Sequence, residues 1–351
     1  MAGPSGAVLI VGGGLAGGLL ALELRQRGAA VTLLDAAEAD TATGLSYGGI
    51  PGWPLLPTPL ARRAAGAGRR WRQLQRRYGD LGWRGCGLRL HGAPALEPWA
   101  RWLPFSRVDP LRLRTRLPEV LAAAGVVRRR GRAVALQPSP AGWRLQLAQG
   151  DSLEAPQLVL AAGAGCRALW PALPPQLRCS WAGVLEHPSL AAERITLPRQ
   201  LQRPLLERRA GQLAAADWVV DAGLAPWGEA ALLGQISWVA PAEGEPSAPP
   251  DPEQMRCWLG QGLAACGEPW RAALAGAGAY HQVPVAFSSD GLPLVGPVAE
   301  APGLWVFSGF SGAFAQVPVL APLLADGLAA PPPRRQRAQR RLQAVGLGVL
   351  G

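Results

Sequence analysis

The first 35 residues alternate between apolar runs and glycines in a pattern that predicts two buried strands around one helix. Residues 7–11 read AVLIV without a polar interruption, as expected of a parallel strand that is buried on both faces. A leucine-rich helix is predicted from Leu15 to Arg27, and Gly28 ends it. A second apolar strand, Val31 to Leu34, leads directly into Asp35. This order of elements predicts the start of a parallel α/β sheet.

Three glycines between the first strand and the helix have the spacing of a dinucleotide-binding turn. Gly12, Gly14 and Gly17 form G-x-G-x-x-G. The first glycine permits a tight turn, the second lets a pyrophosphate approach the backbone, and the third lets the helix pack closely on the strand. The helix N-terminus offers N–H groups to phosphates, and Asp35 is placed to bind a ribose. The arrangement predicts a dinucleotide site; a glycine turn with a structural role alone is the alternative.

The rest of the chain predicts more helices and strands. Asp109 and Pro110 mark a helix start, because the carboxylate caps free N–H groups and proline suits the first helical position. Pro118 predicts a kink or a break in that helix. The other predicted elements are a loop over 36–52, a helix over 59–78, strands over 126–136, 143–147 and 158–163, a β-rich region over 177–241, a helix over 252–274 and a strand over 304–307.

The composition excludes several classes of enzyme. The 351 residues carry a net charge of +11, and every basic residue is arginine because the sequence contains no lysine. Without lysine there is no Schiff-base chemistry and no phosphate-loop signature, so pyridoxal phosphate enzymes, lysine aldolases and P-loop nucleotidases are excluded. With 49% hydrophobic residues the chain can bury a large core, which predicts one large or two interleaved domains.

The numbers and spacing of cysteine and histidine residues indicate whether a metal site is expected and which redox compartment suits the protein. Five widely spaced cysteines form no C-x-x-C pair, and there are three histidines, so we expect no metal site. The odd number of cysteines fits a reducing compartment better than a disulfide framework. No segment reaches about 18 uninterrupted apolar residues, the length of a transmembrane helix. We therefore expect a soluble, cytoplasmic protein.

A second glycine-rich element near the C-terminus distinguishes flavin from nicotinamide. Residues 289–297 read SDGLPLVGP, and residues 303–312 read GLWVFSGFSG. With the N-terminal glycines, the loop from Ser46 to Gly49 and the strand end Ala161–Gly163, these segments resemble the D-amino acid oxidase and glycine oxidase family of FAD-dependent oxidoreductases. The resemblance covers nearly the whole chain and implies FAD as the cofactor.

The resemblance implies an α/β fold with two interleaved domains. A Rossmann-like FAD-binding domain with a parallel sheet is expected beside an antiparallel-sheet (α+β) substrate domain. The expected segments are 1–80, 105–175 and 285–330 for the FAD-binding domain, 81–104 and 176–284 for the substrate domain, and 331–351 for a basic, mobile tail.

The resemblance also implies the residues that hold FAD. The pyrophosphate is expected at the N-terminal glycines and the adenosine ribose at Asp35, with the backbone of Val134 at the adenine. The loop that contains Ser46 lies beside the flavin, and the turn after Gly309 faces its ring. The implied cofactor-binding residues are Gly12, Gly14, Leu15, Ala16, Gly17, Asp35, Ser46, Gly48, Gly49, Val134, Ala162, Gly163, Gly309, Phe310, Ser311, Gly312 and Ala313.

The sequence departs from this family where the substrate is expected to bind. Amino acid oxidases of this family clamp the substrate carboxylate with an arginine shortly before the D-G-x-P turn, because a planar guanidinium binds a carboxylate with two hydrogen bonds. Val283 stands about there in this chain, and Phe310, Ala313 and Phe314 predict an apolar pocket floor. Either another arginine holds the carboxylate, or the substrate is an amine that lacks one. The arginine candidates are Arg203, Arg208 and Arg209, and the polar catalytic candidates nearby are His281 and Tyr280.

These observations predict an FAD-dependent oxidoreductase that oxidises the C–N bond of a small amine or amino acid by hydride transfer, giving an imine. The expected partners are that substrate and dioxygen or another electron acceptor. Oxidation of a modified tRNA nucleoside amine is one alternative, which the excess of arginine suits, although nucleic acid is the less favoured partner. A flavin-binding protein without amine oxidase activity is another. An NAD(P)H-driven reductase is disfavoured, because no second G-x-G-x-x-G follows a strand.

Overall fold

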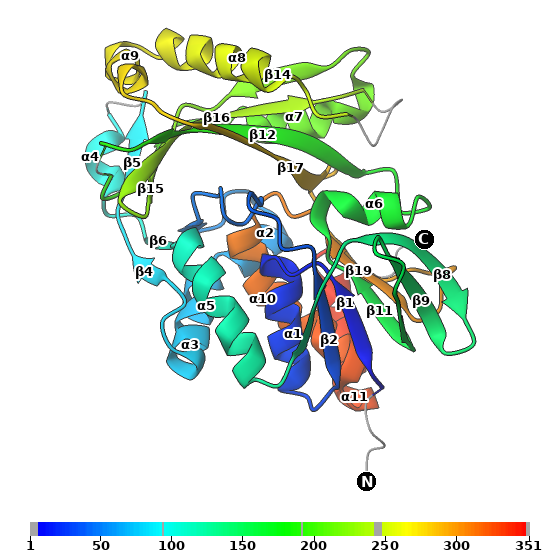
Figure 1. Ribbon diagram of the computed structural model, residues 1–351. Coiled ribbons are helices and arrows are strands. Elements are labelled where there is room, and N and C mark those ends of the chain that lie inside the picture. The colour runs from blue at the N-terminus through cyan, green and yellow to red at the C-terminus, as the bar shows by residue number, and fades with distance from the viewer. Residues whose placement is uncertain (1–5, 93–94, 191, 242–247, 349–351) are drawn as a thin grey trace.

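A six-stranded sheet forms the centre of the dinucleotide-binding half of the molecule (Figure 1). The computed structural model describes residues 6–92, 95–190, 192–241 and 248–348. The sheet has the order β18-β19-β11-β1-β2-β7, and all neighbouring strands are parallel except the pair β18 and β19. Its strands are β1 (Val8–Val11), β2 (Val31–Asp35), β7 (Val127–Arg130), β11 (Gln157–Leu160), β18 (Leu294–Pro297) and β19 (Leu304–Ser308).

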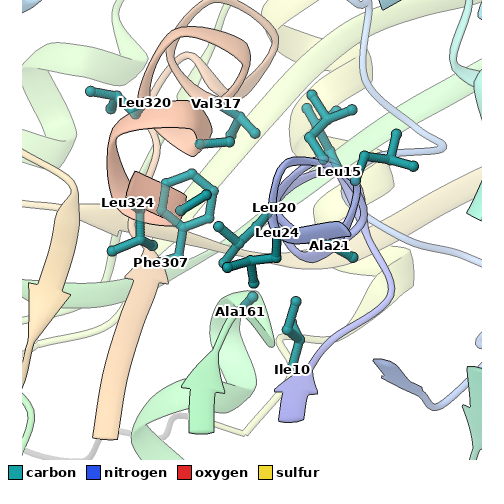
Figure 2. Close-up of a cluster of buried hydrophobic side chains, with 14 of the residues drawn as sticks. Ile10, Leu15, Leu20, Ala21, Leu24, Ala161, Phe307, Val317, Leu320 and Leu324 are labelled. Carbon is teal, nitrogen blue, oxygen red and sulfur yellow. The ribbon is translucent and has the colours of Figure 1, made fainter. Parts of the chain in front are cut away.

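Helices cover one face of this sheet and a small antiparallel sheet covers the other. The helices are α1 (Leu15–Arg25), α2 (Pro59–Ala64), α3 (Ala67–Tyr78), α5 (Pro110–Ala123) and α10 (Ala313–Ala329). Figure 2 shows the core between them: Ile10 of β1, Phe307 of β19 and Ala161, directly after β11, meet apolar residues of α1 and α10. The opposite face packs against β8 (Ala133–Ser139), β9 (Gly142–Leu147), β10 (Ser152–Ala155) and α6 (Cys166–Leu169).

A larger, mainly antiparallel sheet forms the other half and has two distinct faces. Its order is β17-β12-β16-β15-β13-β5, and β14 pairs with β16. The outer face packs against α8 (Pro252–Ala265) and α9 (Glu268–Ala275), at the top of Figure 1. The inner face carries Val184, Leu232 and Val283, which contact Leu45 and Tyr47 of the dinucleotide-binding half. The strands are β5 (Leu88–His91), β12 (Leu177–His187), β13 (Ile195–Pro198), β14 (Asp217–Val220), β15 (Leu224–Trp227), β16 (Ala230–Val239) and β17 (Tyr280–Ser288).

One small sheet and two short helices lie beside these sheets. A three-stranded sheet, β3-β6-β4, consists of β3 (Gly49–Pro51), β4 (Trp83–Gly85) and β6 (Phe105–Val108). Helix α7 (Arg203–Arg209) packs Leu206 against Val239 and Phe287 of the large sheet, and α4 (Glu97–Ala100) follows β5. The predicted α/β class, with one parallel and one antiparallel sheet, is confirmed; the domain boundaries stay a prediction. No described helix has the length and apolarity to cross a membrane.

Two helices predicted as continuous are each divided in the structure. The segment over 59–78 forms α2 and α3, separated at Gly66, and the segment over 252–274 forms α8 and α9, separated at Gly267 with φ of +107°. A glycine at positive φ leaves the helical region, which explains the second break. The strand predicted over 126–136 is likewise two strands, β7 and β8, of different sheets.

The structure excludes a break at Pro118, one of the two outcomes expected there, and differs from the expectation for the C-terminal tail. Helix α5 is not broken at Pro118: Asp109 caps it as predicted, and Leu113 and Leu117 anchor it in the core, so the loss of one backbone hydrogen bond is tolerated. The tail expected to be mobile contains helix α11 (Pro332–Gln343), whose Ala338 and Leu342 are buried. Its arginines therefore lie on a packed amphipathic helix; residues 349–351 of the tail lie outside the described part.

Candidate active site

The N-terminal glycine turn has a geometry that only glycine fits. Gly12 has a φ of +114°, and a Cβ there would lie 2.3 Å from the carbonyl oxygen of Ala161. A Cβ at Gly17 would lie 2.0 Å from the carbonyl oxygen of Gly12. The first glycine therefore lets the chain turn against the end of β11, and the last lets α1 start directly on the turn.

A cavity of about 230 Å³ opens at this turn, where the dinucleotide was predicted. Asp35 lies at its wall and accepts a hydrogen bond from the Ala37 N–H over 3.0 Å. The N–H of Leu15, in the first turn of α1, donates to Thr43 Oγ1 over 3.2 Å. The lining residues are Gly13, Gly14, Leu15, Asp35, Ala37, Glu38, Thr41, Thr43, Leu113, Arg114, Leu117, Pro118, Leu121 and Arg128.

The sequence analysis did not predict Thr43, Arg114 and Arg128 as residues of this cavity. It did predict Val134, which lies outside the cavity. Thr43, Arg114 and Arg128 come from a loop, from α5 and from β7, and only the packing of three separate segments brings them together. The polar residues of the glycine-rich loop after Asp35 were the one sequence feature that could have indicated Thr43 as a residue of the cavity. Val134, expected at the adenine, is 50% exposed on β8 and does not line this cavity.

The loop that contains Ser46 is held by its own side chains. Ser46 Oγ accepts a hydrogen bond from the Gly48 N–H over 3.1 Å, and Gly48 has a φ of +68° with no room for a Cβ beside the Val108 carbonyl. Tyr47, which the sequence analysis missed, donates from its hydroxyl to the carbonyl oxygen of Gly234 in β16. Burial and the nearby carboxylate of Asp221 raise the pKa of Tyr47. This loop is thus tied to the inner face of the large sheet.

The C-terminal glycine turn also lies against that sheet. Gly309 has a φ of +80°, and a Cβ there would touch Leu177 at the start of β12. Gly312 precedes α10, and a Cβ there would have no atom within 4 Å among the described residues. Gly163, at the end of β11, has equally open surroundings. Gly309 therefore lies where the C-terminal turn meets the large sheet.

The aromatic residues of this turn do not form a pocket floor. Phe310 packs edge-on against Phe307, with ring centroids 4.8 Å apart, and Phe314 stacks near Trp71, with centroids 6.2 Å apart. Both belong to the core between α1, α3 and α10. These two side chains therefore lie in the core, whereas Val184, Leu232 and Val283 are the apolar residues of the inner face that pack near Leu45 and Tyr47.

A buried charge cluster joins α7 to the turn. Arg203 Nη2 donates to the carbonyl oxygen of Ser311 over 2.6 Å, and Arg203 Nε lies 3.6 Å from Glu207 Oε1. Burial raises the pKa of Glu207, although Arg203 and a hydrogen bond with Ser311 oppose that shift. Asp221 accepts hydrogen bonds from the N–H groups of Gln202 and Arg203, over 2.6 and 3.0 Å.

Of the three arginine candidates, Arg203 alone contacts the turn. Arg208 donates to the carbonyl oxygen of Pro204 within its own helix, and Arg209 pairs with Asp217 at the surface.

The two predicted polar candidates point to opposite faces of β17. The His281 ring lies on the inner side, with Nδ1 3.1 Å from Asp40 and Nε2 3.4 Å from Glu186. Tyr280 packs with the residues under α8 and α9, and its hydroxyl donates to Gln282. Burial raises the pKa of that hydroxyl. The structure therefore places His281, but not Tyr280, on the face that meets the glycine loops.

Comparison with known proteins finds a family match for the N-terminal part of the chain. Residues 7–107 match the model of the family described as FAD dependent oxidoreductase. Over these residues the chain is similar to that family. The matched residues contain the glycine turn, Asp35 and the loop from Ser46 to Gly49. A search of the curated proteins found no match.

Solved structures of oxidases and a dehydrogenase share the fold over nearly the whole chain. Glycine oxidase from Geobacillus kaustophilus is 18% identical, with a TM-score of 0.67 over 92% of this chain and 94% of that one. Iminodiacetate oxidase from Chelativorans sp. BNC1 is 17% identical, with a TM-score of 0.65 over 92% and 94%. L-proline dehydrogenase from P. horikoshii is 14% identical, with a TM-score of 0.68 over 92% and 93%.

The residues present fit FAD, the cofactor of the family. The cavity beside Asp35 suits the adenosine half, and the N-terminus of α1 offers N–H groups to the pyrophosphate. Gly163 and Gly312 leave open backbone where a flavin ring needs close approach. One buried side-chain atom near that turn, Gln316 Oε1, has no hydrogen-bond partner among the described residues and can accept a bond from a bound group.

Proposed function

We propose that this FAD-dependent oxidoreductase oxidises the C–N bond of a small amine or amino acid. The observation that carries the proposal is the direct junction between the C-terminal glycine turn and the inner face of the large sheet, through Arg203 and Ser311. A substrate on the inner face would lie against the flavin. Glycine oxidase, iminodiacetate oxidase and L-proline dehydrogenase, whose names denote such substrates, share the fold and support the proposal.

The proposed reaction balances without a further cofactor. FAD, when bound, accepts a hydride from the carbon attached to the substrate nitrogen. The nitrogen releases one proton as the C=N bond forms, and water hydrolyses the imine to a carbonyl compound and an amine or ammonia. The two electrons leave the protein on dioxygen or another acceptor.

In this proposal the protein positions the substrate and excludes water from the flavin, and it forms no covalent bond with the substrate. The Ser46–Gly49 loop is fixed to β16 through Tyr47, and the C-terminal turn is fixed to α7 through Arg203. Val184, Leu232 and Val283 form an apolar surface between these anchors. Such a surface holds a C–H group against the flavin and excludes water from it. We further propose a cytoplasmic location, which the odd number of cysteines supports.

Anaerobic spectroscopy tests the proposal. The purified protein is expected to be yellow, and mixing with a panel of small amines and amino acids without oxygen is expected to bleach the colour with at least one compound. The Gly12→Ala variant serves as the control. Its Cβ would clash with the Ala161 carbonyl oxygen and distort the turn that is expected to bind FAD, so this variant is expected to be colourless. A yellow protein that no panel member bleaches would reject amine oxidation and leave a flavin-binding protein without that activity.

A further inference from the structure

Arg107 of β6 is a fully buried arginine with unused hydrogen-bond donors. Its side chain is 0% exposed, and Nη2 donates to the Pro226 carbonyl oxygen over 3.0 Å. Nε and Nη1 have no hydrogen-bond partner among the described residues. Nε carries one N–H and Nη1 carries two, so three of the five donors of this guanidinium are unpaired there. Buried polar groups without a partner are costly, so an acceptor on a ligand would stabilise this side chain.

The charge of Arg107 is also incompletely balanced. Asp109 Oδ2 lies 3.7 Å from Nη2, and the Asp109 side chain is 23% exposed. The other oxygen, Oδ1, accepts hydrogen bonds from the N–H groups of Leu111 and Arg112 at the start of α5. Burial lowers the pKa of Arg107, and the charge of Asp109 opposes that shift. A guanidinium stays protonated in proteins, so a second negative charge at its unpaired N–H groups would offset the cost of burying it.

The small sheet β3-β6-β4 places Arg107 between the Ser46–Gly49 loop and a second cavity. Arg107 lies directly opposite Gly49 of β3 on one side and Arg84 of β4 on the other. The second cavity has a volume of about 470 Å³ and is lined by Arg84, Gly85, Cys86, Gly87, Glu193 and Arg194. Burial raises the pKa of the Cys86 thiol, and the charge of Arg107 opposes that shift. The guanidinium therefore lies close to the wall of this cavity.

The same guanidinium lies against the large sheet. Pro226, whose carbonyl oxygen accepts the bond from Nη2, belongs to β15. The next residue, Trp227, packs with Val184, Leu232 and Val283 of the inner face. A carboxylate bound at the unpaired donors would therefore lie at the edge of the apolar surface proposed for the substrate.

Two buried arginines near the C-terminal turn are already used by the fold. Arg203 donates to the Ser311 carbonyl oxygen and pairs with Glu207, and Arg178 donates to the Ala240 carbonyl oxygen over 2.7 Å. Arg107 differs from both in having buried nitrogens without a partner among the described residues.

We propose that Arg107 binds the carboxylate of the substrate, which is therefore an amino acid rather than a simple amine. The inference rests on the proposed function and narrows its substrate class. A guanidinium binds a carboxylate through charge-assisted hydrogen bonds. The carboxylate would be held beside β15, three strands along the large sheet from Val283 of β17, where family members carry the clamping arginine. Arg84 and Arg194, at the neighbouring cavity, would attract an anionic group toward this position.

Matched pairs of compounds test the substrate class on the unmodified protein. The pairs are glycine with methylamine, proline with pyrrolidine and phenylglycine with benzylamine, each mixed without oxygen at the same pH and concentration. In at least one pair, the amino acid is expected to bleach the flavin about ten-fold faster or more than its partner without the carboxylate. Equal or faster bleaching by the amine in every reactive pair would overturn the inference while the proposed function stands. Bleaching by neither set would reject the proposed function itself.

Two variants test the role of Arg107. Arg107→Met is expected to raise KM for the reactive amino acid about ten- to hundred-fold with a smaller change in kcat, because charge-assisted hydrogen bonds are lost. The KM of the matched amine should stay unchanged, since it makes no such contact. Arg107→Lys, which keeps the charge, should recover part of the affinity, and Arg89→Met, exposed on β5, should leave both KM values unchanged. An equal rise of both KM values, or none, in a folded, yellow Arg107→Met protein would overturn the assignment.

Benzoate, which has a carboxylate and no oxidisable amine, measures the same contact without turnover. Its perturbation of the flavin spectrum gives a dissociation constant, which Arg107→Met should raise about ten- to hundred-fold and Arg89→Met should leave unchanged. A crystal structure of the unmodified protein with benzoate is expected to show the carboxylate within about 4 Å of the Arg107 guanidinium. A carboxylate bound away from Arg107 would overturn the assignment, whether or not the variants hold FAD.

Discussion

Arg203 and Ser311, 108 residues apart in sequence, are joined by a hydrogen bond of 2.6 Å from Nη2 to the carbonyl oxygen. This bond connects α7, which packs on the inner face of the large sheet, to the turn that precedes α10. The arginine has a second partner in Glu207 of its own helix. One guanidinium therefore links the C-terminal glycine turn to the helix on the large sheet.

Replacement of this arginine is expected to weaken FAD binding. Arg203→Gln removes the bond to Ser311 and leaves Glu207 buried without its counter-ion, so we expect a loss of about 1–3 kcal/mol in the free energy of unfolding. FAD affinity is expected to fall about ten-fold, measured by the quenching of flavin fluorescence on binding to the apoprotein. Arg208→Gln, on the exposed side of α7, is the matched control and should match the unchanged protein in both measurements. Equal FAD affinity in the two variants would show that the bond does not position the turn.

Alanine substitutions at two glycines with positive φ can distinguish the cost of a steric clash from the cost of an unfavourable backbone conformation. Gly12→Ala places a Cβ 2.3 Å from the Ala161 carbonyl oxygen, whereas Gly150→Ala, with a φ of +95°, meets no atom within 4 Å. The second change is expected to cost about 1–2 kcal/mol from conformation alone. The first should cost more and abolish FAD binding. Denaturant unfolding and the flavin content of the purified proteins measure both, and similar losses in the two variants would contradict the close approach of β1 and β11.

The carboxylate of Asp35, the last residue of β2, is expected to contribute to cofactor affinity. Asp35→Ala removes the acceptor at the wall of the 230 Å³ cavity, so FAD should bind about ten-fold more weakly, as the loss of one or two hydrogen bonds to a ribose implies. Asp151→Ala, an exposed carboxylate in the turn between β9 and β10, is the control. Riboflavin, which has no adenosine, should bind the Asp35 variant and the unchanged protein equally. Weaker riboflavin binding by the variant would indicate a general loss of structure instead.

The dinucleotide turn was predictable because its constraints are local. Strand, glycine spacing, helix and Asp35 follow one another within about 30 residues, and each has a steric or electrostatic reason for its place. The family resemblance added the second glycine turn and hence FAD. The apolar character of Val283 was also predicted, because it is a property of one residue in one strand.

Relationships between distant segments were not predictable. The bond from Tyr47 to Gly234 spans 187 residues, and no local pattern indicates it. Phe310 and Phe314 read as apolar, but the sequence does not say whether they face a pocket or the core. For Tyr280 and His281 a signal existed: consecutive residues of a strand point to opposite faces, so only one of them could meet the site.

The buried carboxyl group of Glu207 is expected to make stability depend on pH. Burial raises its folded-state pKa above the usual 4.5, so the native protein holds this proton more tightly than the unfolded chain does. Its contribution to stability is therefore complete below pH 4.5 and is lost as the pH rises through the folded-state pKa. Glu207→Gln lacks this titration, so the unchanged protein should lose Tm relative to the variant as the pH rises above about 4.5. Thermal unfolding of both proteins across that range, with Glu253→Gln as the exposed control, measures the difference. A constant difference in Tm would mean that Arg203 and Ser311 fully offset the cost of burying the charge.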